Sequence, residues 1–532
     1  MSQSCRSRYW PGIVLALIFV AFSSSTAIWI GKDKTPPVWD PADHINTAFD
    51  YYSTLKNGGL TGFLSEFFLS PHHYAPVFHL MMGSNFLLFG PSIVAARLTN
   101  LVSLALLLIS TYGIGKRLYD RSAGLLAALV GSSYHMSAAF IHEAFIDYTL
   151  LAFVSLSFWM LIRAEDFHSR KWATVFGAAL GLGMLVKQTF IFFFWLPLAA
   201  QFAYLLRRKD SPALINFSWA LVIGGAIAAV WYVPHLKETL EIYRVNRAAA
   251  IGEGDPPVLS FYSIFAYLYA MANYQVQPLF FLLFIAGLIL SLRRHRRQNR
   301  ILYLWLLSAY LAFTAQPNKD PRYTLPLLTA AALLTAYLAY TINAPGRRMA
   351  AYLLIAGCSI VSFFTTQWPI DNGGEPRTGL SRSATVALQA LSRNVDHIDQ
   401  GPQSRDWSLG SIAEAIADYS EKPHTVVGIA DNEPLFNPST FGVYFRLLRK
   451  EKAESVLQAR GIEEGEWQRQ INRCDFIVTK AGNIRESNQT AASHRLASLI
   501  AGAPDCIRLA AFSLPDGTSA VVYKVGRDSP LK

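Results

Sequence analysis

Ionisable side chains stand at the ends of long apolar segments, where a chain can hold chemistry next to a lipid surface. They fall in four short stretches: Asp40, Asp43 and His44; His142, Glu143 and Asp147; Lys187; and Arg322. A carboxylate in such a place can accept a proton as a general base or bind a metal ion. Lysine can hold a phosphate, and arginine offers a planar pair of donors that matches phosphate oxygens. These residue types suit acid–base chemistry beside a bound phosphate.

Each stretch also has a structural interpretation. Asp40 before Pro41, with Asp43 in the first turn, is a good helix start. If a helix begins there, Asp40 and His44 share one face, and a capping carboxylate is held rigidly enough to act in catalysis as well. The acids and the histidine at 142–147 can mark the water boundary, and Lys187 can extend along apolar surface to reach water. The 318–323 stretch can be a surface turn.

The elements that must position these residues are membrane helices, because two kinds of loop alternate along the chain. One kind is crowded with Lys and Arg, at 116–121, 163–171, 207–209, 293–300 and 347–348. Short loops of that composition stay in the cytoplasm. The other loops carry the candidate residues, which therefore gather at the opposite face, and such bunching favours a site over scattered solvation.

Composition agrees with a polytopic membrane protein. The chain has 532 residues, of which 52% are hydrophobic and 16% charged, too apolar for an ordinary soluble protein of this size. About eleven spans are predicted, near residues 11–30, 92–115, 123–141, 147–163, 173–187, 189–206, 213–234, 277–292, 301–315, 324–342 and 349–366. The net charge of +11 reflects topology and contact with membrane lipids rather than nucleic acid.

A change of composition divides the chain. Residues 1–370 form the transmembrane domain, with outer loops at 31–90 and 235–275, and a linker at 371–377 leads into a domain of soluble polarity at 371–532. That domain is predicted to be a small α/β unit with strands at 425–430 and 476–479, helices near 439–450, 463–473 and 491–500, and a closing hairpin at 507–525. With an odd number of spans it lies outside the cytoplasm. Its turn at 432–437 is either structural or a ligand site, and Cys474 and Cys506 either pair or remain thiols.

Several short motifs follow one another in a characteristic order and spacing: Trp39-Asp40 with His44, Tyr74-Ala75-Pro76, Phe89-Gly90-Pro91 with Ala96-Arg97-Leu98, Gly115-Lys116-Arg117-Leu118-Tyr119 with Ala123-Gly124-Leu125, Asp147-Tyr148, Leu185-Val186-Lys187 and Pro321-Arg322-Tyr323. In these motifs the chain resembles the GT-C glycosyltransferases over roughly residues 10–345, in particular the bacterial branch related to protein O-mannosyltransferases and lipid A aminoarabinose transferases (RgtA/B/C/D-like). Two positions depart from the family pattern. Pro41 stands where many members have Glu, which makes Asp43 a substitute, and His142-Glu143 replaces the usual Arg before Asp147.

The resemblance implies an enzyme of the bacterial inner membrane that uses a polyprenyl-phosphate-linked sugar donor and inverts the anomeric centre. The acceptor would be an envelope glycan, lipid or protein. Asp40 would be the base, assisted by Asp147 or Asp43, while Lys187 and Arg322 would bind the donor phosphate. His44, Glu143 and His142 are candidates for metal or acceptor binding. Some members need a divalent metal ion, and the resemblance leaves this open here. The alternative is a transporter or flippase for a lipid-linked glycan, which would usually carry polar residues near the bilayer midplane.

Overall fold

The computed structural model describes residues 3–253, 255–369, 401–420, 422, 425–448, 453–455, 464–482 and 488–526. The chain divides into two compact units. We call Met1–Ile30, Thr54–Met81 and Arg97–Gly401 the helical unit, and Gly31–Ser53, Met82–Ala96 and Pro402–Lys532 the sheet unit. The sheet unit thus includes part of the first outer loop as well as the C-terminal residues. The predicted linker at 371–377 lies outside the described residues, and the predicted boundary after 370 stays a prediction.

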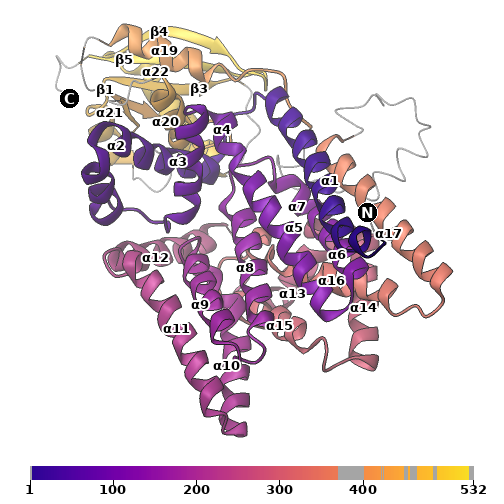
Figure 1. Cartoon of the computed structure of the whole chain (residues 1–532). Helices are drawn as coiled ribbons and strands as arrows, with labels where there is room; N and C mark the ends of the chain where they lie inside the picture. Colours follow the sequence, from indigo (N-terminus) through magenta and orange to yellow (C-terminus); the bar gives the residue numbers. More distant parts are fainter. Residues whose placement is uncertain are drawn as a thin grey trace, which may run out of the picture. The chain divides into compact units, whose positions relative to one another are not determined.

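The helical unit is built almost entirely from helices, many of them long and apolar (Figure 1). They are α1 (Gln3–Lys32), α5 (Thr99–Leu118), α6 (Arg121–Ser133), α7 (His135–Phe140), α8 (Ile146–Arg163), α9 (Arg170–Met184), α10 (Ile191–Arg208), α11 (Ser211–Tyr232), α12 (Leu236–Glu253), α13 (Phe261–Ala270), α14 (Pro278–Arg294), α15 (Arg300–Thr314), α16 (Leu327–Tyr340) and α17 (Pro345–Gln367). Among the described residues, six stretches are long and apolar enough to cross a membrane: Tyr9–Lys32, Ile93–Leu118, Ile146–Arg163, Gln188–Arg208, Ser211–Tyr232 and Pro345–Gln367.

A helix stands at each of the eleven predicted spans, but their number stays a prediction. The predicted span at 123–141 is not one helix. It is broken at Tyr134, where ψ is 143°, so α6 ends and the short α7 begins. Tyr134 is fully buried, and its hydroxyl lies 3.1 Å from that of Thr335, which fixes the break inside the unit.

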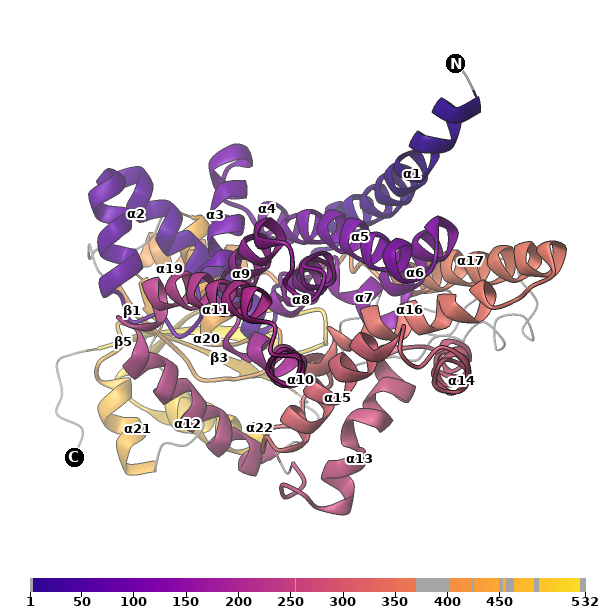
Figure 2. The same cartoon turned by 60° about the horizontal axis from the view of Figure 1, so that its bottom comes forward.

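The helices α6, α8 and α16 are largely buried within the helical unit, and Figure 2 shows α16 close to α6. Every residue from Leu327 to Tyr337 of α16 is buried, which is typical of a helix surrounded by other helices. The ring of Phe158 on α8 stacks on Trp305 of α15, with centroids 3.8 Å apart and planes within 9°. This stacking packs the second half of α8 against α15, and Asp147 lies in the first turn of the same helix.

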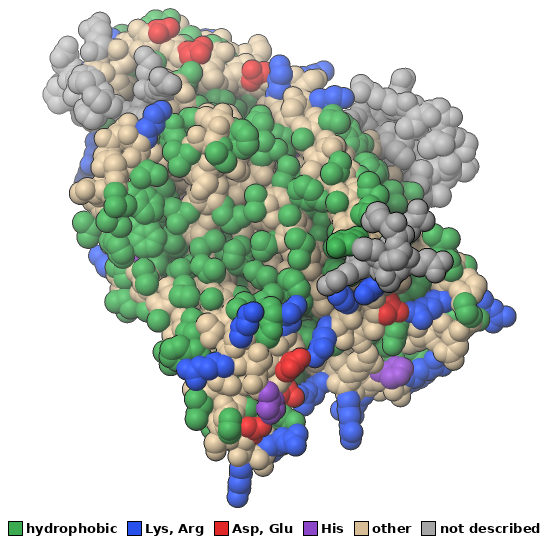
Figure 3. Space-filling view, in the orientation of Figure 1, with side chains coloured by type: hydrophobic (Ala, Val, Ile, Leu, Met, Phe, Trp, Pro, Cys, Tyr) green, Lys and Arg blue, Asp and Glu red, His purple; other side chains and the backbone are tan. Residues whose placement is uncertain are grey.

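Lys and Arg side chains gather at one end of the helical unit. They stand where α8 is joined to α9 and α10 to α11, and in Figure 3 they lie below a broad area of hydrophobic side chains. The first residues of α8 and the last residues of α9 lie at the other end of the same helices. Within this unit the Lys- and Arg-rich loops therefore lie at one end and the loops with the candidate site residues at the other, as predicted from the sequence.

The sheet unit contains a five-stranded sheet in the order β2-β1-β3-β5-β4. Its strands are β1 (Thr425–Ile429), β2 (Ala453–Ser455), β3 (Phe476–Ala481), β4 (Cys506–Ser513) and β5 (Ser519–Val525). β1 runs parallel to β2 and β3, whereas β5 is antiparallel to β3 and β4. The predicted strands and closing hairpin are confirmed, with Gly517 at the turn in the left-handed conformation (φ 85°), as hairpin turns often require. Strand β2 was not predicted.

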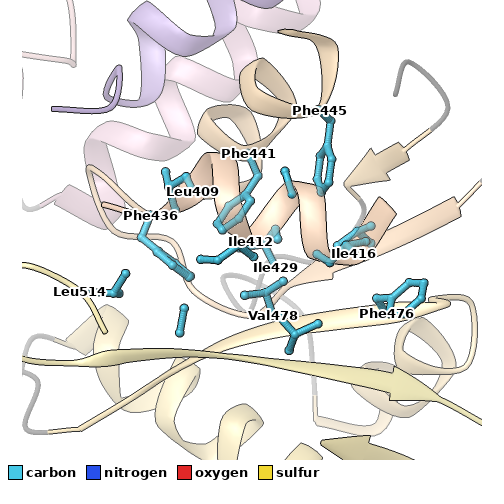
Figure 4. Close-up of a cluster of buried hydrophobic side chains, with 14 residues drawn as sticks. Leu409, Ile412, Ile416, Ile429, Phe436, Phe441, Phe445, Phe476, Val478 and Leu514 are labelled. Atoms are coloured by element: carbon cyan, nitrogen blue, oxygen red, sulfur yellow. The ribbon is translucent and has the colours of Figure 1, made fainter. Parts of the chain in front are cut away.

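Helices cover both faces of this sheet. On one face α19 (Leu409–Tyr419) and α20 (Pro438–Leu447) bury a core that includes Ile412, Phe441 and Val478 (Figure 4). On the other face α21 (Glu464–Ile471) and α22 (Asn488–Gly502) pack Trp467 and Leu496 against Ile477. Cys474 is fully buried in this second core and, like Cys506, is a free thiol.

The first outer loop contributes α2 (Trp39–Leu69), α3 (Val77–Phe89) and α4 (Ile93–Arg97). The helix α2 is kinked at Gly59, whose φ of 60° is a conformation that glycine adopts without steric cost. Its first half, up to Ser53, belongs to the sheet unit, and the remainder belongs to the helical unit. The first outer loop is thus largely helical.

Candidate functional site

A buried ion pair joins Asp147 and Lys187 in the helical unit. Asp147 lies in the first turn of α8 and is 1% exposed. Lys187 follows the end of α9 in an extended conformation, just before the short helix η1 (Gln188–Phe190). The ammonium nitrogen donates to Asp147 Oδ1 over 2.7 Å. The second oxygen, Oδ2, is buried and has no hydrogen-bond partner among the described residues, so the carboxylate keeps acceptor capacity for a group that enters the site.

Arg322 lies beside this pair. It belongs to the short helix η3 (Pro321–Thr324), which Asp320 caps by accepting from the Arg322 backbone N–H over 2.9 Å. The other Asp320 oxygen accepts from Arg322 Nε over 2.6 Å. The guanidinium carbon lies 5.3 Å from the ring centre of Phe145, two residues before Asp147. Tyr323 completes the cluster, because its ring centre is 5.2 Å from the Lys187 nitrogen.

The second outer loop holds the Arg322 hairpin from the other side. Gln275, in the π-helical turn η2 (Met271–Gln275), donates to the Thr324 hydroxyl over 2.7 Å. The hydroxyl of Tyr267 donates to the Asn318 carbonyl over 3.3 Å. Lys319 donates to the carbonyl of Thr314 at the end of α15 over 3.1 Å. The hairpin that carries Arg322 is therefore fixed by hydrogen bonds at several points.

His142 and Glu143 belong to a second cluster, built around Arg97. Arg97 is 2% exposed, and its guanidinium lies 3.5 Å from the Glu143 carboxylate. The indole of Trp29 stacks on His142 with ring centres 3.7 Å apart and lies 5.7 Å from the Arg97 guanidinium carbon. A buried arginine needs such a carboxylate partner. Glu143 is therefore engaged in pairing Arg97.

Asp40, Asp43 and His44 lie in the sheet unit. The helix α2 begins at Trp39, so Asp40 stands inside its first turn rather than before it. Asp40 is half-buried, Asp43 is exposed and His44 is buried. Surrounding protein raises the pKa of Asp43, a hydrogen bond with Ser439 opposes the rise, and the Asp40 charge adds to it. Because the side chain is open to water, solvent limits this shift.

The structure thus brings together Asp147, Lys187 and Arg322 in one cluster, and His142 with Glu143 in another. The sequence analysis did not single out Arg97, Phe145 or Tyr323 as site residues. Arg97 could have been found, because a lone arginine inside an apolar stretch must be paired with an acid. The contacts of Phe145 and Tyr323 with Arg322 and Lys187 depend on the fold and leave no signal in the spacing.

The cluster around Asp147 does not fit a metal ion. Among the described residues no three His, Cys, Asp or Glu side chains are placed to hold one. Lys187 already neutralises the Asp147 carboxylate, and a divalent cation at the same oxygens would be repelled by the ammonium. We therefore derive no step through a metal.

Residues 73–237 match the family described as dolichyl-phosphate-mannose-protein mannosyltransferase. The chain is also similar to an undecaprenyl phosphate-α-4-amino-4-deoxy-L-arabinose arabinosyl transferase of Pseudomonas aeruginosa strain LESB58. The two are 25% identical over 273 residues, which is 47% of this chain and 46% of the relative. An uncharacterized protein of Aquifex aeolicus is 27% identical over 241 residues, 43% of this chain and 45% of its own length. The chain matches less than half of the length of these curated relatives.

Solved structures share the fold over nearly the whole chain. ArnT from Cupriavidus metallidurans bound to undecaprenyl phosphate superposes with a TM-score of 0.56 at 15% identity, covering 97% of this chain and 99% of that one. The Archaeoglobus fulgidus oligosaccharyltransferase in complex with zinc and sulfate gives a TM-score of 0.54 at 12% identity, covering 98% of this chain and 74% of that one.

The fold is therefore that of the GT-C membrane glycosyltransferases, a multi-pass membrane protein with a small C-terminal α/β domain. Within that class the chain is similar to the mannosyltransferase family over residues 73–237 and to an aminoarabinose transferase over less than half of its length.

Proposed function

We propose that the chain is a glycosyltransferase of the bacterial inner membrane. It moves a sugar from a polyprenyl-phosphate donor to an envelope glycan, lipid or protein acceptor on the outer leaflet, with inversion at the anomeric carbon. The observation that carries this proposal is the buried Lys187–Asp147 pair beside Arg322. The similarity to an undecaprenyl-phosphate-dependent transferase supports the class of donor.

Lys187 and Arg322 hold the donor phosphate in this proposal. An ammonium group has three N–H donors, so Lys187 can bind phosphate while one donor stays on Asp147. Asp320 accepts from Arg322 Nε over 2.6 Å, and the guanidinium offers a planar set of donors that matches phosphate oxygens. Asp147 and Asp320 thus orient the two cations. As the sugar–oxygen bond breaks, both electrons pass to the phosphate oxygen, and the cations stabilise the charge that develops there.

The acceptor hydroxyl attacks the anomeric carbon from the opposite side and loses its proton to a carboxylate. Asp40 is our choice for this base, as the family resemblance implies, with Asp43 next to it. Asp147 is engaged by the Lys187 ammonium, which donates to its Oδ1 over 2.7 Å. Its role in the proposal is to hold Lys187.

A transporter or flippase was the alternative. The relatives whose names state an activity are transferases, and the buried ion pair lies at the ends of α8 and α9 rather than in the middle of a helix. Both points favour transfer of the sugar over passage of the whole lipid.

The test uses purified full-length protein with a panel of radiolabelled undecaprenyl-phosphate sugars and envelope glycolipids as acceptors. We expect label to pass to the acceptor with one donor of the panel, and Lys187→Ala to bind undecaprenyl phosphate less tightly. Movement of the labelled lipid across a liposome membrane without any transfer would overturn the proposal.

A further inference from the structure

The segment that carries Asp40 is attached to the C-terminal part of the sheet unit. Near Asp40, the Trp39 indole donates to Asn432 Oδ1 over 3.0 Å, and the Thr440 hydroxyl donates to the Pro37 carbonyl over 2.9 Å. Five further contacts extend this attachment from residue 33 to residue 50. They are hydrogen bonds from the Gln403 backbone N–H to Asp33 Oδ1, from the Lys34 backbone N–H to the Gln403 carbonyl, from Asn46 Nδ2 to the Ser439 carbonyl and between the side chains of Asp43 and Ser439, and an ion pair between Asp50 and Arg446.

Apart from Gln403, which contacts Asp33 and Lys34, the partners of this segment come from two adjoining elements, the turn at 432–437 and the helix α20. The turn is closed by reciprocal backbone hydrogen bonds between Glu433 and Phe436, of 3.0 and 3.1 Å. It ends at Asn437, whose side chain caps α20 by accepting from the Thr440 backbone N–H over 3.0 Å. Of the two interpretations of this turn, the contacts described here favour a structural one.

Buried charged side chains hold the turn at 432–437 in place, at the edge of the sheet where the parallel strands β1 and β3 end. Lys480 at the end of β3 has a side chain only 2% exposed, which pairs with Glu433 of the turn and lies 2.6 Å from Asp516. Asp431, after β1, accepts from the Lys480 backbone N–H over 2.8 Å. In open α/β sheets, ligands usually bind at the carboxyl ends of the strands. In this sheet the same edge is followed by the turn at 432–437, whose Asn432 accepts the hydrogen bond from Trp39.

The helices α2 and α20 approach each other closely at Gly442. A Cβ at this position would come within 3.1 Å of the Asn46 amide nitrogen, which is closer than side chains normally approach. Alanine would favour the interior of α20 by about 1 kcal/mol. A side chain at position 442 would therefore require the Asn46 side chain to shift by a few tenths of an ångström.

We propose that Asn432, Thr440 and Arg446 are positioning residues for the reaction: they hold the start of α2, and with it Asp40, in its working orientation. This rests on the proposed function, because Asp40 is the base assigned there. The C-terminal domain then contributes to catalysis through the first outer loop. The donor cations Lys187 and Arg322 belong to the helical unit and lack these contacts, so positioning should affect turnover and not donor binding.

The experiment compares the full-length protein with the triple variant Asn432→Ala, Thr440→Val, Arg446→Met. We expect amide hydrogen exchange in residues 37–50 to become at least about tenfold faster. With the donor of the panel that the wild type uses, kcat should fall by about tenfold to a hundredfold, because displacement of a reacting group by about 1 Å has effects of that size. Affinity for undecaprenyl phosphate should stay within twofold.

The matched control is Lys422→Met, which breaks the 2.6 Å ion pair with Asp475 in the same unit without touching α2. It should change neither the exchange of residues 37–50 nor kcat. The single variant Arg446→Asp should speed amide exchange in residues 37–50 and lower kcat. The double variant Arg446→Asp with Asp50→Arg, in which the two charges are exchanged, should restore both the exchange rate and kcat. Such recovery would identify the pair itself as the cause.

Two results would overturn the positioning role: unchanged exchange in residues 37–50 of the triple variant, or faster exchange with unchanged kcat. The exchange measurement needs no substrate. It therefore separates failure of the attachment from failure of the proposed function, which would appear as absence of transfer by the wild type with every donor of the panel.

Discussion

Lys187 and Asp147 lie where neither charge has ready access to water, and each depends on the other. Breaking a buried pair by removing one partner leaves the second charge uncompensated and costs about 3–5 kcal/mol. Replacing both with apolar residues removes that penalty. Stability and donor binding should therefore respond differently to the same substitutions.

We expect Lys187→Met and Asp147→Leu each to lower the unfolding temperature of the full-length protein, and the double variant to regain most of it. Donor binding should not return in the double variant, because no ammonium is left for the phosphate. Thermal unfolding and undecaprenyl phosphate binding, measured on the same samples, check this. A double variant as unstable as the sum of the single ones would show that the pair is not coupled.

Asp40 and the phosphate cations should be separable by kinetics. Asp40→Asn is expected to lower turnover by about a hundredfold to ten-thousandfold, the range for loss of a general base, with donor affinity and melting behaviour nearly normal. Lys187→Ala and Arg322→Ala should weaken donor binding as well, because the phosphate is charged before the reaction begins. Wild-type turnover in a folded Asp40→Asn protein would move the base to Asp43 or Asp147.

Asp431 should make the sheet unit sensitive to pH. Burial first, and then the Glu433 charge, raise the pKa of Asp431 to about 7, against the opposing Lys480 hydrogen bond and charge. Between about pH 4 and pH 7 the folded unit therefore holds a proton that the unfolded chain has lost. Its stabilising effect is present at low pH and is lost as the pH rises toward 7, by up to about 1.4 kcal/mol per pH unit.

The comparison is with Asp431→Asn, which keeps an acceptor for the Lys480 N–H but does not titrate. Calorimetry of the full-length proteins from pH 5 to pH 8 should show the sheet-unit transition falling with pH in the wild type and remaining flatter in the variant. Equal slopes in the two proteins would assign the pH dependence to another group.

At the scale of elements, the sequence predicted what depends on local patterns. The hairpin β4–β5 has alternating side chains around Pro515-Asp516-Gly517, and β1 and β3 are short apolar runs, so each was recognised. The strand β2 has three residues, Ala453–Ser455, too few for a periodic signal. The break at Tyr134 was missed for a different reason. It depends on a hydroxyl contact with Thr335, about two hundred residues along the chain, which no window on the sequence contains.

In the candidate site, too, features that depend on local sequence were predicted, and contacts that depend on the tertiary fold were not. Asp147, Lys187 and Arg322 were predicted as ionisable residues at helix ends, and hydrophobicity alone makes such positions visible. That Asp147 pairs with Lys187 could not be seen, because the pairing depends on how α8 packs against α9. The attachment of residues 33–50 to α20 was also invisible, since its partners are separated by almost four hundred residues.

For the whole molecule, we predict that the N-terminus is cytoplasmic and the C-terminal domain extracytoplasmic. The Lys and Arg side chains at one end of the helical unit are the reason. A reporter fused at the C-terminus that is active only outside the cytoplasm should work, and the same reporter fused after Arg208 should not. In a background without other cysteines, Asp320→Cys should be labelled by an impermeant reagent applied from outside. The reverse pattern would invert the topology.

Cys474 has a practical consequence. Its thiol is sealed in the second core of the sheet unit, and burial, followed by the nearby Asp475 charge, raises its pKa to about 12. Alkylating reagents attack the thiolate, so the folded protein should resist them until that core opens. With the other cysteines replaced by serine, the rate at which Cys474 is alkylated in intact membranes reports how often this core opens spontaneously. The protein thus carries its own chemical sensor of stability, usable without purification or detergent.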